Sequence, residues 1–389
     1  MEQTLAMNPL TQLFAYPFRI FFLSTAVWAV LAVVLWTLTV SGLLSLPLAH
    51  APLQWHRHEM LFGMLTPAIA GFLLTAVCVW TGTDRLRNAP LVLMWVVWLA
   101  GRLTATFGGA DLNALSITLN LSFLPLVALD AGWRIVRARQ WRQLLLMAVL
   151  TLLWLVQAGL LMDGGRAWTN GGLVLAAILM LVVGGRITPA FSANWLRGHG
   201  GDPAAVRTVP ALDIALLVAL GLLLVVTLTG FDPGLPLAAG VAALLALARL
   251  ALWRGWLVRR EPLLWILHLS LLWIPVALLL LAGHYQFGWP PTAWQHALGI
   301  GAIGGLILGV MTRVSLGHTG RPMALPRGMV SAYLLIQLAV VVRLLTVFGV
   351  LPWQPGVTVT AGAWVLAYAL FLWRYAAVLW LPRADGKPG

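Results

Sequence analysis

The sequence predicts an all-α fold, a polytopic bundle of transmembrane helices. Of its 389 residues, 61% are hydrophobic and only 9% are charged, whereas a soluble domain carries about 25% charged residues. Apolar stretches long enough to cross a hydrocarbon core about 30 Å thick recur along the whole chain. They lack the alternating pattern of an outer-membrane barrel, so only helices can span the bilayer here.

Twelve apolar stretches, rich in Leu, Val, Ala and Gly, are expected to form the spans. Their approximate ranges are 18–42, 58–80, 91–107, 113–130, 144–162, 171–190, 210–230, 234–252, 263–283, 294–311, 328–348 and 357–381. The first is too long for the apolar part of a signal peptide and follows no basic segment, so we interpret it as a retained helix. No loop is long enough for a soluble domain, and we expect a single transmembrane domain over residues 1–389.

The basic residues predict the orientation of the chain. The formal net charge is +13, and most arginines lie in the loops after the even-numbered helices. The loops after the odd-numbered helices hold only Arg57 and Arg166. Cytoplasmic loops carry the excess of Lys and Arg, so we place the even-numbered loops and both termini in the cytoplasm. A basic inner rim accounts for the charge, and we expect no nucleic-acid partner.

The cysteine and histidine content limits the metal chemistry. The chain has one cysteine, Cys78, which excludes a disulfide framework and a site built from several thiolates. Any metal must therefore use His, Met or carboxylate ligands. The predicted topology places His50, His56, His58, His284 and His296 toward the outer side, and His199, His268 and His318 toward the inner side.

The second span begins with a dense polar stretch, WHRHEMLFG (55–63). Residues four apart share one face of an α-helix, so His56, Met60 and Met64 are expected to form one stripe. Imidazole and thioether ligands suit Cu(I), although methionines at this spacing also fill gaps in helix packing. Glu59 either stabilises the N-terminus of this helix or accepts a hydrogen bond from a ligand histidine.

The second and tenth spans share a pattern that links His58 with His296. Each histidine is followed by Gly at +5, Ile at +11 and Gly at +13, namely Gly63, Ile69 and Gly71 and then Gly301, Ile307 and Gly309. Small residues permit the close approach of a helix or a flat ligand. We therefore expect the two histidines at equal depth, where they would hold a haem between them.

Arginines mark two further polar stretches and two deeper positions. GGRITPAF (184–191) contains Arg186, and the sixth span is expected to break at Pro189. MTRVSLGHTGRP (311–322) combines Arg313, His318 and Arg321. These arginines would pair with haem propionates or extend to lipid phosphates. Arg102 and Arg343 lie deeper, where a charge indicates a functional site, but the sequence does not name their partners.

Several of these stretches together resemble a known family. HRHEMLFG (56–63), AGFLLTAVCVWTG (70–82), GGRITPAF, LHL (267–269) and MTRVSLGHTGRP occur in the same order as blocks of the NnrS family of bacterial haem- and copper-containing membrane proteins. The resemblance runs from about Phe14 to Arg374. It implies a multi-pass protein of the bacterial inner membrane, linked to denitrification, nitrosative stress and nitric oxide tolerance. It also implies haem and copper as cofactors and nitric oxide as a ligand.

Carried over residue by residue, the resemblance covers the motif positions but not Met64, His50 or His284. The matching positions are His56, His58, Glu59, Met60, Gly63, Gly184, Gly185, Arg186, Pro189, His268, His296, Arg313, Gly317, His318, Thr319, Gly320 and Arg321. We interpret His58 and His296 as haem or metal ligands, and His56 with Met60 as copper ligands. His268 and His318, with the three arginines, would form a second site or hold the haem instead.

Two other functions stay open at this point. Twelve helices with cytoplasmic termini are common among secondary transporters of small solutes, but the acidic residues fall near helix ends, where a proton-coupled carrier would not need them. A membrane enzyme without metal would use His318 as a base and needs acidic or nucleophilic partners that the sequence does not provide. Whether nitric oxide would be bound, reduced or oxidised is also left open.

Overall fold

The computed structural model describes residues 9–48, 50–109 and 114–387. These residues form helices and connecting loops without any strand, and twelve helical segments are long and apolar enough to cross a membrane. The predicted all-α bundle of twelve spans is therefore confirmed. In chain order the helices are α2 (Pro17–Val40), α3–η1–α4 (Pro52–His58, Glu59–Met64, Leu65–Thr81), α5 (Ala89–Phe107), α6 (Ala114–Arg137), α7 (Leu144–Met162), α8 (Arg166–Gly198), α9 (Pro210–Thr229), α10 (Leu235–Trp253), α11 (Pro262–Phe287), α12–η6–α13 (Pro291–His296, Ala297–Gly304, Gly305–His318), α14 (Met329–Val347) and α15 (Trp353–Trp380).

Proline and glycine define many of the helix ends. Proline occupies the first turn of α2, α3, α5, α9, α10, α11 and α12, where its missing N–H is not needed and its fixed φ suits the helix. Gly82, Gly230 and Gly288 end α4, α9 and α11 in the left-handed conformation, which costs glycine little.

Two boundaries differ from the sequence prediction. Helix α8 continues through Pro189 to Gly198, so the predicted break is wrong. Proline is tolerated inside membrane helices because neighbouring groups satisfy the freed carbonyl, and α6 and α11 contain proline in the same way. The second span begins at Pro52, which places Glu59 well inside it and excludes the role at the helix N-terminus.

The second and tenth spans each contain a π-helix directly after their histidine. Segment η1, Glu59–Met64, follows His58, and segment η6, Ala297–Gly304, follows His296. π-helices are rare and occur frequently at functional sites. The sequence pattern that relates the two histidines therefore coincides with a shared backbone irregularity.

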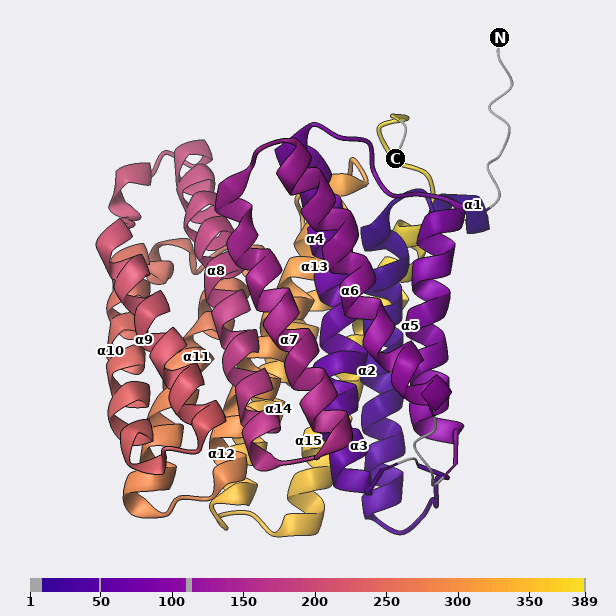
Figure 1. Cartoon of the computed structure of the whole chain (residues 1–389). Coiled ribbons are helices and arrows are strands. Elements are labelled where there is room, and N and C mark those ends of the chain that lie inside the picture. The colour runs from indigo at the N-terminus through magenta and orange to yellow at the C-terminus, as the bar shows by residue number, and fades with distance from the viewer. Residues whose placement is uncertain (1–8, 49, 110–113, 388–389) are drawn as a thin grey trace. The chain divides into compact units, whose positions relative to one another are not determined.

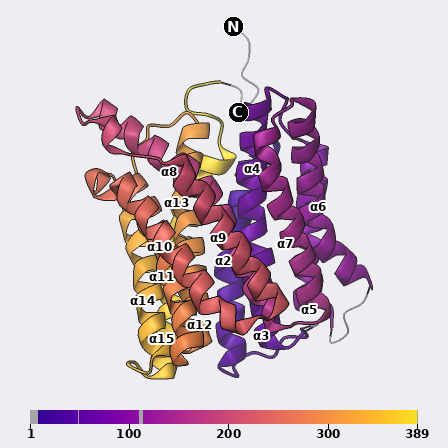
Figure 2. The same ribbon diagram turned by 60° about the vertical axis from the view of Figure 1, so that its left-hand side comes forward.

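The chain consists of two compact units. Unit 1 comprises residues 1–164, 311–329 and 368–389, and unit 2 comprises residues 165–310 and 330–367. Within unit 1, α2 packs against α4, and α6 packs against α4, α5 and α7 (Figure 1). Within unit 2, α8 packs against α9, α9 against α10, α10 against α11, and α11 against α8 (Figure 2). Helix α11 also packs against η6.

Burial separates the spans that carry the polar motifs from the others. The second, sixth and tenth spans are 78%, 72% and 72% buried over their most apolar windows, and no other span exceeds 56%. The other spans are more exposed and are therefore suited to contact lipid chains. These three most buried spans carry WHRHEMLFG, GGRITPAF and the His296 segment, and within them His58, Glu59 and Thr188 are buried, whereas Arg186 is exposed.

Candidate functional site

A cluster of buried polar side chains lies in unit 1 and is centred on Glu59. Its members come from five segments of the chain, and they are His58, Glu59, Arg102, Asn120 and Gln157. The side chain of Glu59 is fully buried, and His58 and Arg102 are each 2% exposed. Charged groups at such positions are costly unless they are paired, so their mutual contacts decide whether the cluster is stable.

The Glu59 carboxylate joins a histidine to an arginine. Its Oε1 atom accepts a hydrogen bond from Nδ1 of His58 at 2.8 Å, and its Oε2 atom accepts one from Nη1 of Arg102 at 3.1 Å. This is the second of the two roles that the sequence left open for Glu59, a hydrogen-bond acceptor for a histidine N–H. The arginine partner, which the sequence did not name, balances the charge of the carboxylate.

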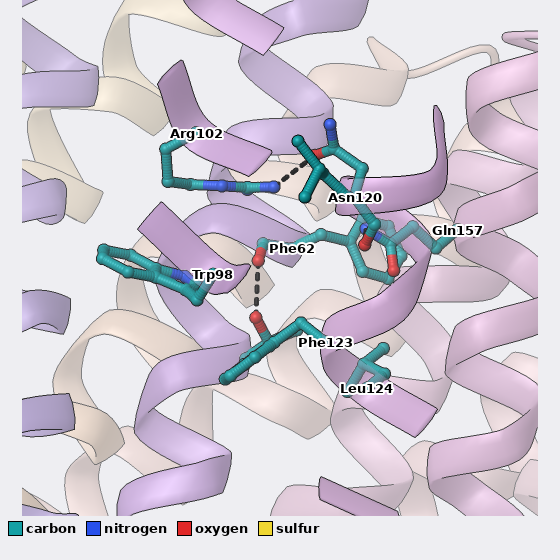
Figure 3. Close-up of a pocket in the computed structure, with 9 residues that line it drawn as sticks. Phe62, Trp98, Arg102, Asn120, Phe123, Leu124 and Gln157 are labelled. Carbon is teal, nitrogen blue, oxygen red and sulfur yellow. Dashed lines mark hydrogen bonds between the residues drawn. The ribbon is translucent and has the colours of Figure 1, made fainter. Parts of the chain in front are cut away.

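Asn120 holds the other arm of Arg102. Nη2 of Arg102 donates to Oδ1 of Asn120, as the dashed line in Figure 3 marks. The amide of Asn120 in turn donates to the carbonyl oxygens of Gly101 at 3.2 Å and Ser116 at 2.9 Å. The guanidinium is thus oriented from two sides, which fixes the position of Glu59 as well.

Gly63 makes room for this ion pair. A Cβ atom at position 63 would overlap the side chains of Trp28, Glu59 and Arg102. The carbonyl of Gly63 also accepts a hydrogen bond from Nε1 of Trp98 at 3.1 Å. The close approach of these groups to the backbone therefore requires glycine, and the π-helix η1 supplies it at the level of the carboxylate.

The other ring nitrogen of His58 faces Gln157. With Nδ1 donating to Glu59, Nε2 carries the lone pair and accepts from the Gln157 amide at 3.2 Å. The same amide nitrogen is 3.1 Å from the Asn120 carbonyl, while Oε1 of Gln157 is buried without a partner among the described residues. Gln157, Phe62, Trp98 and Phe123 line a narrow pocket that has no room even for a water molecule (Figure 3).

His296 has a simpler environment in unit 2. Its Nδ1 donates to the carbonyl oxygen of Thr292 at 2.7 Å, which leaves the lone pair on Nε2. No hydrogen bond to Nε2 comes from the part of unit 2 that the structure describes. Histidines that bind metals commonly donate their second N–H to a carbonyl or carboxylate, and both His296 and His58 meet this condition.

The glycines of the shared pattern serve packing within each unit. A Cβ atom at Gly63 or Gly71 would meet Trp28 or Phe22, and one at Gly301 or Gly309 would meet Trp273 or Leu267. In both cases the covering side chains come from α2 or α11. Small residues allow the close approach of either a helix or a flat ligand, and these glycines allow the close approach of a helix. His58 and His296 belong to different units, and their pairing across a haem stays a prediction.

The predicted copper ligands, His56 and Met60, flank His58 and Glu59 in the chain. The His56 ring stacks on Trp36, with ring centroids 4.4 Å apart and an interplanar angle of 17°, and Met60 is half-buried. The π-helix from Glu59 to Met64 departs from the α-helical geometry that the predicted stripe of His56, Met60 and Met64 assumes. Copper binding by His56 and Met60 stays a prediction.

His268 takes part in a second polar cluster, in unit 2. The hydroxyl of Ser192 donates to the Thr188 carbonyl at 2.8 Å, so Nε2 of His268, 2.9 Å from that hydroxyl, is the donor between them. Nearby, Arg249 pairs with Asp213 at 2.6 Å. A Cβ atom at Gly185 would overlap the guanidinium of Arg249, whereas Arg186 itself is exposed.

His318, Arg313 and Arg321 lie in unit 1, whereas His268 and Arg186 lie in unit 2, so their grouping is untested. The His318 ring lies 5.5 Å from Phe18, and its carbonyl accepts from Arg383 at 2.9 Å. Arg383 also holds Asp385 with both arms, at 2.8 and 2.6 Å. These hydrogen bonds lower the pKa of Asp385 to about 2.

The comparison with protein families agrees with the motifs. The family model described as NnrS protein matches residues 12–383, nearly the whole chain. The chain belongs to the NnrS family. The family resemblance predicted from the sequence is therefore confirmed, whereas no curated protein matches the chain.

The residues of this NnrS chain fit the implied cofactors in part. His58 and His296 each have one ring N–H held by an acceptor, which suits a metal ligand. Within the described ranges, no group of three or more His, Cys, Asp or Glu side chains could hold a metal ion, so a site here must draw on fewer such residues or on methionine. The pocket lined by Gln157 and Phe62 is too small for a haem.

Sequence reasoning missed four residues that complete these clusters, Asn120, Gln157, Asp213 and Arg249. Each is a polar or charged residue within or at the end of an apolar span, and that rarity was the available signal. Their partners lie on other helices, at separations that no local pattern in this NnrS chain reveals.

Proposed function

We propose that this integral membrane protein binds haem and copper in the bacterial inner membrane and takes part in the handling of nitric oxide during denitrification or nitrosative stress. Family membership supports the class of protein. The observation that carries the proposal is the buried imidazole of His58, whose Nδ1–H is held by a carboxylate that Arg102 fixes in turn. A buried histidine arranged in this way is suited to bind a metal through Nε2.

His58 and His296 would hold the haem, and His56 with Met60 would hold copper. Haem iron and copper both accept neutral imidazole and supply a centre that binds a small gas and changes oxidation state. Glu59 fixes the tautomer and the ring orientation of His58. Gln157 would leave Nε2 when His58 binds iron, and its unpartnered Oε1 atom shows that its present position is not fully satisfied. The arginine distribution supports cytoplasmic termini.

The test begins with the protein purified in mild detergent from haem-replete cells. We expect a Soret band in the visible spectrum, copper by metal analysis, and a spectral change when nitric oxide is added. His58→Ala and His296→Ala should each lose haem or alter its low-spin spectrum. His50→Ala, which removes a histidine outside the family pattern, is the matched control.

Each part of the proposal has an outcome that contradicts it. Full haem content with an unchanged spectrum in both His58→Ala and His296→Ala would exclude the paired ligands. Unchanged copper in His56→Ala and Met60→Ala would exclude the copper pair. A colourless wild-type protein would exclude the haem and favour a transporter of a small solute.

A further inference from the structure

The chain contains an internal repeat: spans nine to eleven share sequence and structural features with spans one to three. α2 begins at Pro17 and α11 at Pro262, and each has a tryptophan eleven residues later, Trp28 or Trp273. Three residues before the tryptophan, α2 has Thr25 and α11 has Ser270. In both following spans a π-helix begins directly after a histidine. α5 and α14 both carry RLxxxFG, at 102–108 and 343–349. By this correspondence Arg343 is the counterpart of Arg102, and His296 is the counterpart of His58.

Contacts support the correspondence. Trp28 covers Gly63 in the first copy, and Trp273 covers Gly301 in the second. Farther along the same helices, Phe21 and Phe22 cover Gly71, and Ile266 and Leu267 cover Gly309. Each contact joins the equivalent helices at the equivalent depth, so the repeat is one of packing as well as of sequence.

The two copies differ in the residue that follows the histidine. The residue after His58 is Glu59, which pairs with Arg102, whereas the residue after His296 is Ala297. Arg343 is only 8% exposed and its Nη1 atom is buried without a hydrogen-bond partner among the described residues. Its guanidinium lies over the Trp353 ring at 4.7 Å, and Arg343 is close enough to His296 for their charges to interact.

Unit 2 provides no acid to take the place of Glu59. Its four acidic residues are engaged elsewhere, with Asp213 on Arg249, Glu261 on the N–H of Leu263, Asp202 on the N–H of Ala204, and Asp232 beside Tyr285. A buried guanidinium without a counter-charge is strongly unfavourable. The contact with the Trp353 ring offsets part of this cost, but it does not neutralise the charge.

We propose that Arg343, beside His296, binds an oxygen anion in the position that Glu59 occupies in the first copy. The planar guanidinium pairs best with two oxygen atoms in one plane, so the ligand is a carboxylate or a small planar oxyanion of the nitrite, nitrate or formate type. The anion is either exchangeable from solution or the carboxylate arm of a group that stays bound to the protein. The proposal goes beyond the proposed function and does not require iron on His296.

The test uses the full chain in detergent, in buffer free of carboxylates and oxyanions. Titration with nitrite and with formate is followed by calorimetry and by the thermal unfolding midpoint, which a ligand of the folded state raises. We expect saturable binding at one site in the wild type and at least tenfold weaker binding in Arg343→Gln. Arg142→Gln, a change at an exposed arginine, should bind as the wild type does.

Stability without added anion gives a second readout. If the site is empty after purification, Arg343→Gln should keep or raise the unfolding midpoint, because it removes an unpaired charge, whereas loss of a resident carboxylate should lower it. Arg102→Gln should lower the midpoint in either case by leaving Glu59 unpaired. Ala297→Glu supplies the missing acid and should abolish anion binding. If Ala297→Glu does not fold, the difference in anion binding between Arg343→Gln and Arg142→Gln still tests the proposal.

A resident carboxylate gives a different result from an exchangeable anion. In that case the wild type binds neither probe, and purified Arg343→Gln has lost a carboxylate-bearing group that the wild type retains, measured by mass spectrometry and visible absorbance. The proposal is wrong if the wild type neither binds the probes nor retains such a group. It is equally wrong if the only effect of Arg343→Gln is a lower content of bound phospholipid.

Discussion

At the scale of single residues, Glu59 and Arg102 depend on each other. Glu59 is fully buried and Arg102 nearly so, and removal of one partner of a buried ion pair leaves the other charge without compensation. The pair therefore constrains substitution at both positions much more than its net contribution to stability would suggest. Because the Glu59 carboxylate accepts hydrogen bonds from both residues, the position of Arg102 also determines the orientation of the His58 ring.

We expect Glu59→Gln and Arg102→Gln each to destabilise the protein by about 3–5 kcal/mol. The double variant should recover a large part of that loss, because neither charge is then left unpaired. The measurement is a double-mutant cycle of thermal or detergent unfolding, with Arg142→Gln as a control for loss of a surface charge. Additive effects of the two changes would contradict the ion pair.

Gly63 gives a second prediction at this scale. Gly63→Ala should destabilise the protein by at least about 1–3 kcal/mol, because its Cβ atom would press on Trp28, Glu59 and Arg102. Gly221→Ala is the matched control, since nothing lies within 4 Å of a Cβ atom there and alanine favours the helix. Unfolding midpoints measure both, and equal effects of the two changes would show that position 63 is not crowded.

At the scale of elements, the C-terminal segment is held to the end of α13. Arg383 donates to the His318 carbonyl and clasps Asp385, and the N–H of Ala384 donates to the Thr319 carbonyl at 3.0 Å. The Asp385 carboxylate lies against Gly320, which has φ +67° and where any Cβ atom would overlap it. This arrangement joins the last residues of the chain to the MTRVSLGHTGRP motif.

The ion pair of Arg383 with Asp385, here called the clasp, predicts a definite pH dependence. The pKa of Asp385 is lowered to about 2 by its hydrogen bonds to Arg383, so the clasp is fully formed above the ordinary aspartate value near 3.9 and is lost as the pH falls through about 2. A spin label at Lys387→Cys, in a Cys78→Ser background, should be immobile from pH 8 to 4 and mobile near pH 2.

Asp385→Asn should make the same label mobile at neutral pH, because the amide cannot replace the charged partner of Arg383. A transition between pH 5 and 8, or equal mobility with and without the carboxylate, would contradict the clasp.

The elements also show where local sequence reasoning reached its limit. Hydropathy located all twelve spans because each is set by composition alone. It did not reveal the π-helices, since the residues 59–64 and 297–304 have no composition that separates them from α-helix. The break expected at Pro189 follows a rule for soluble helices, whereas α8 continues through this proline because a membrane span tolerates it.

At the scale of the whole molecule, the sequence predicted the family and the span count, but only one contact of the Glu59 cluster, the one between His58 and Glu59. His58 and Glu59 are neighbours in the chain, so their contact was foreseeable. Arg102, Asn120 and Gln157 come from three other helices, and only tertiary packing brings them together. Long-range partners of this kind cannot be deduced from one sequence, because helical periodicity relates only residues within a turn or two.

The predicted orientation of the chain can be tested directly with introduced cysteines. In a Cys78→Ser background, Phe287→Cys lies at the last residue of the ninth span and Arg142→Cys in the loop after the fourth, and both positions are exposed. A membrane-impermeant maleimide should label Phe287→Cys in intact spheroplasts and Arg142→Cys only after permeabilisation, since the arginine-rich loops are expected inside. The reverse pattern would invert the topology.

The two π-helices have a consequence for how this family can change over time. A π-helix holds about one residue more than an α-helix needs for the same turns, so deletion of one residue from 59–64 would restore an ordinary helix. That deletion would barely alter hydropathy or span length, and the chain would still insert. It would nevertheless change where the Glu59 carboxylate and Gly63 lie relative to Arg102, because the π-helix that places them would be gone. Loss of a single codon here would therefore pass membrane biogenesis unnoticed and abolish the geometry of the cluster.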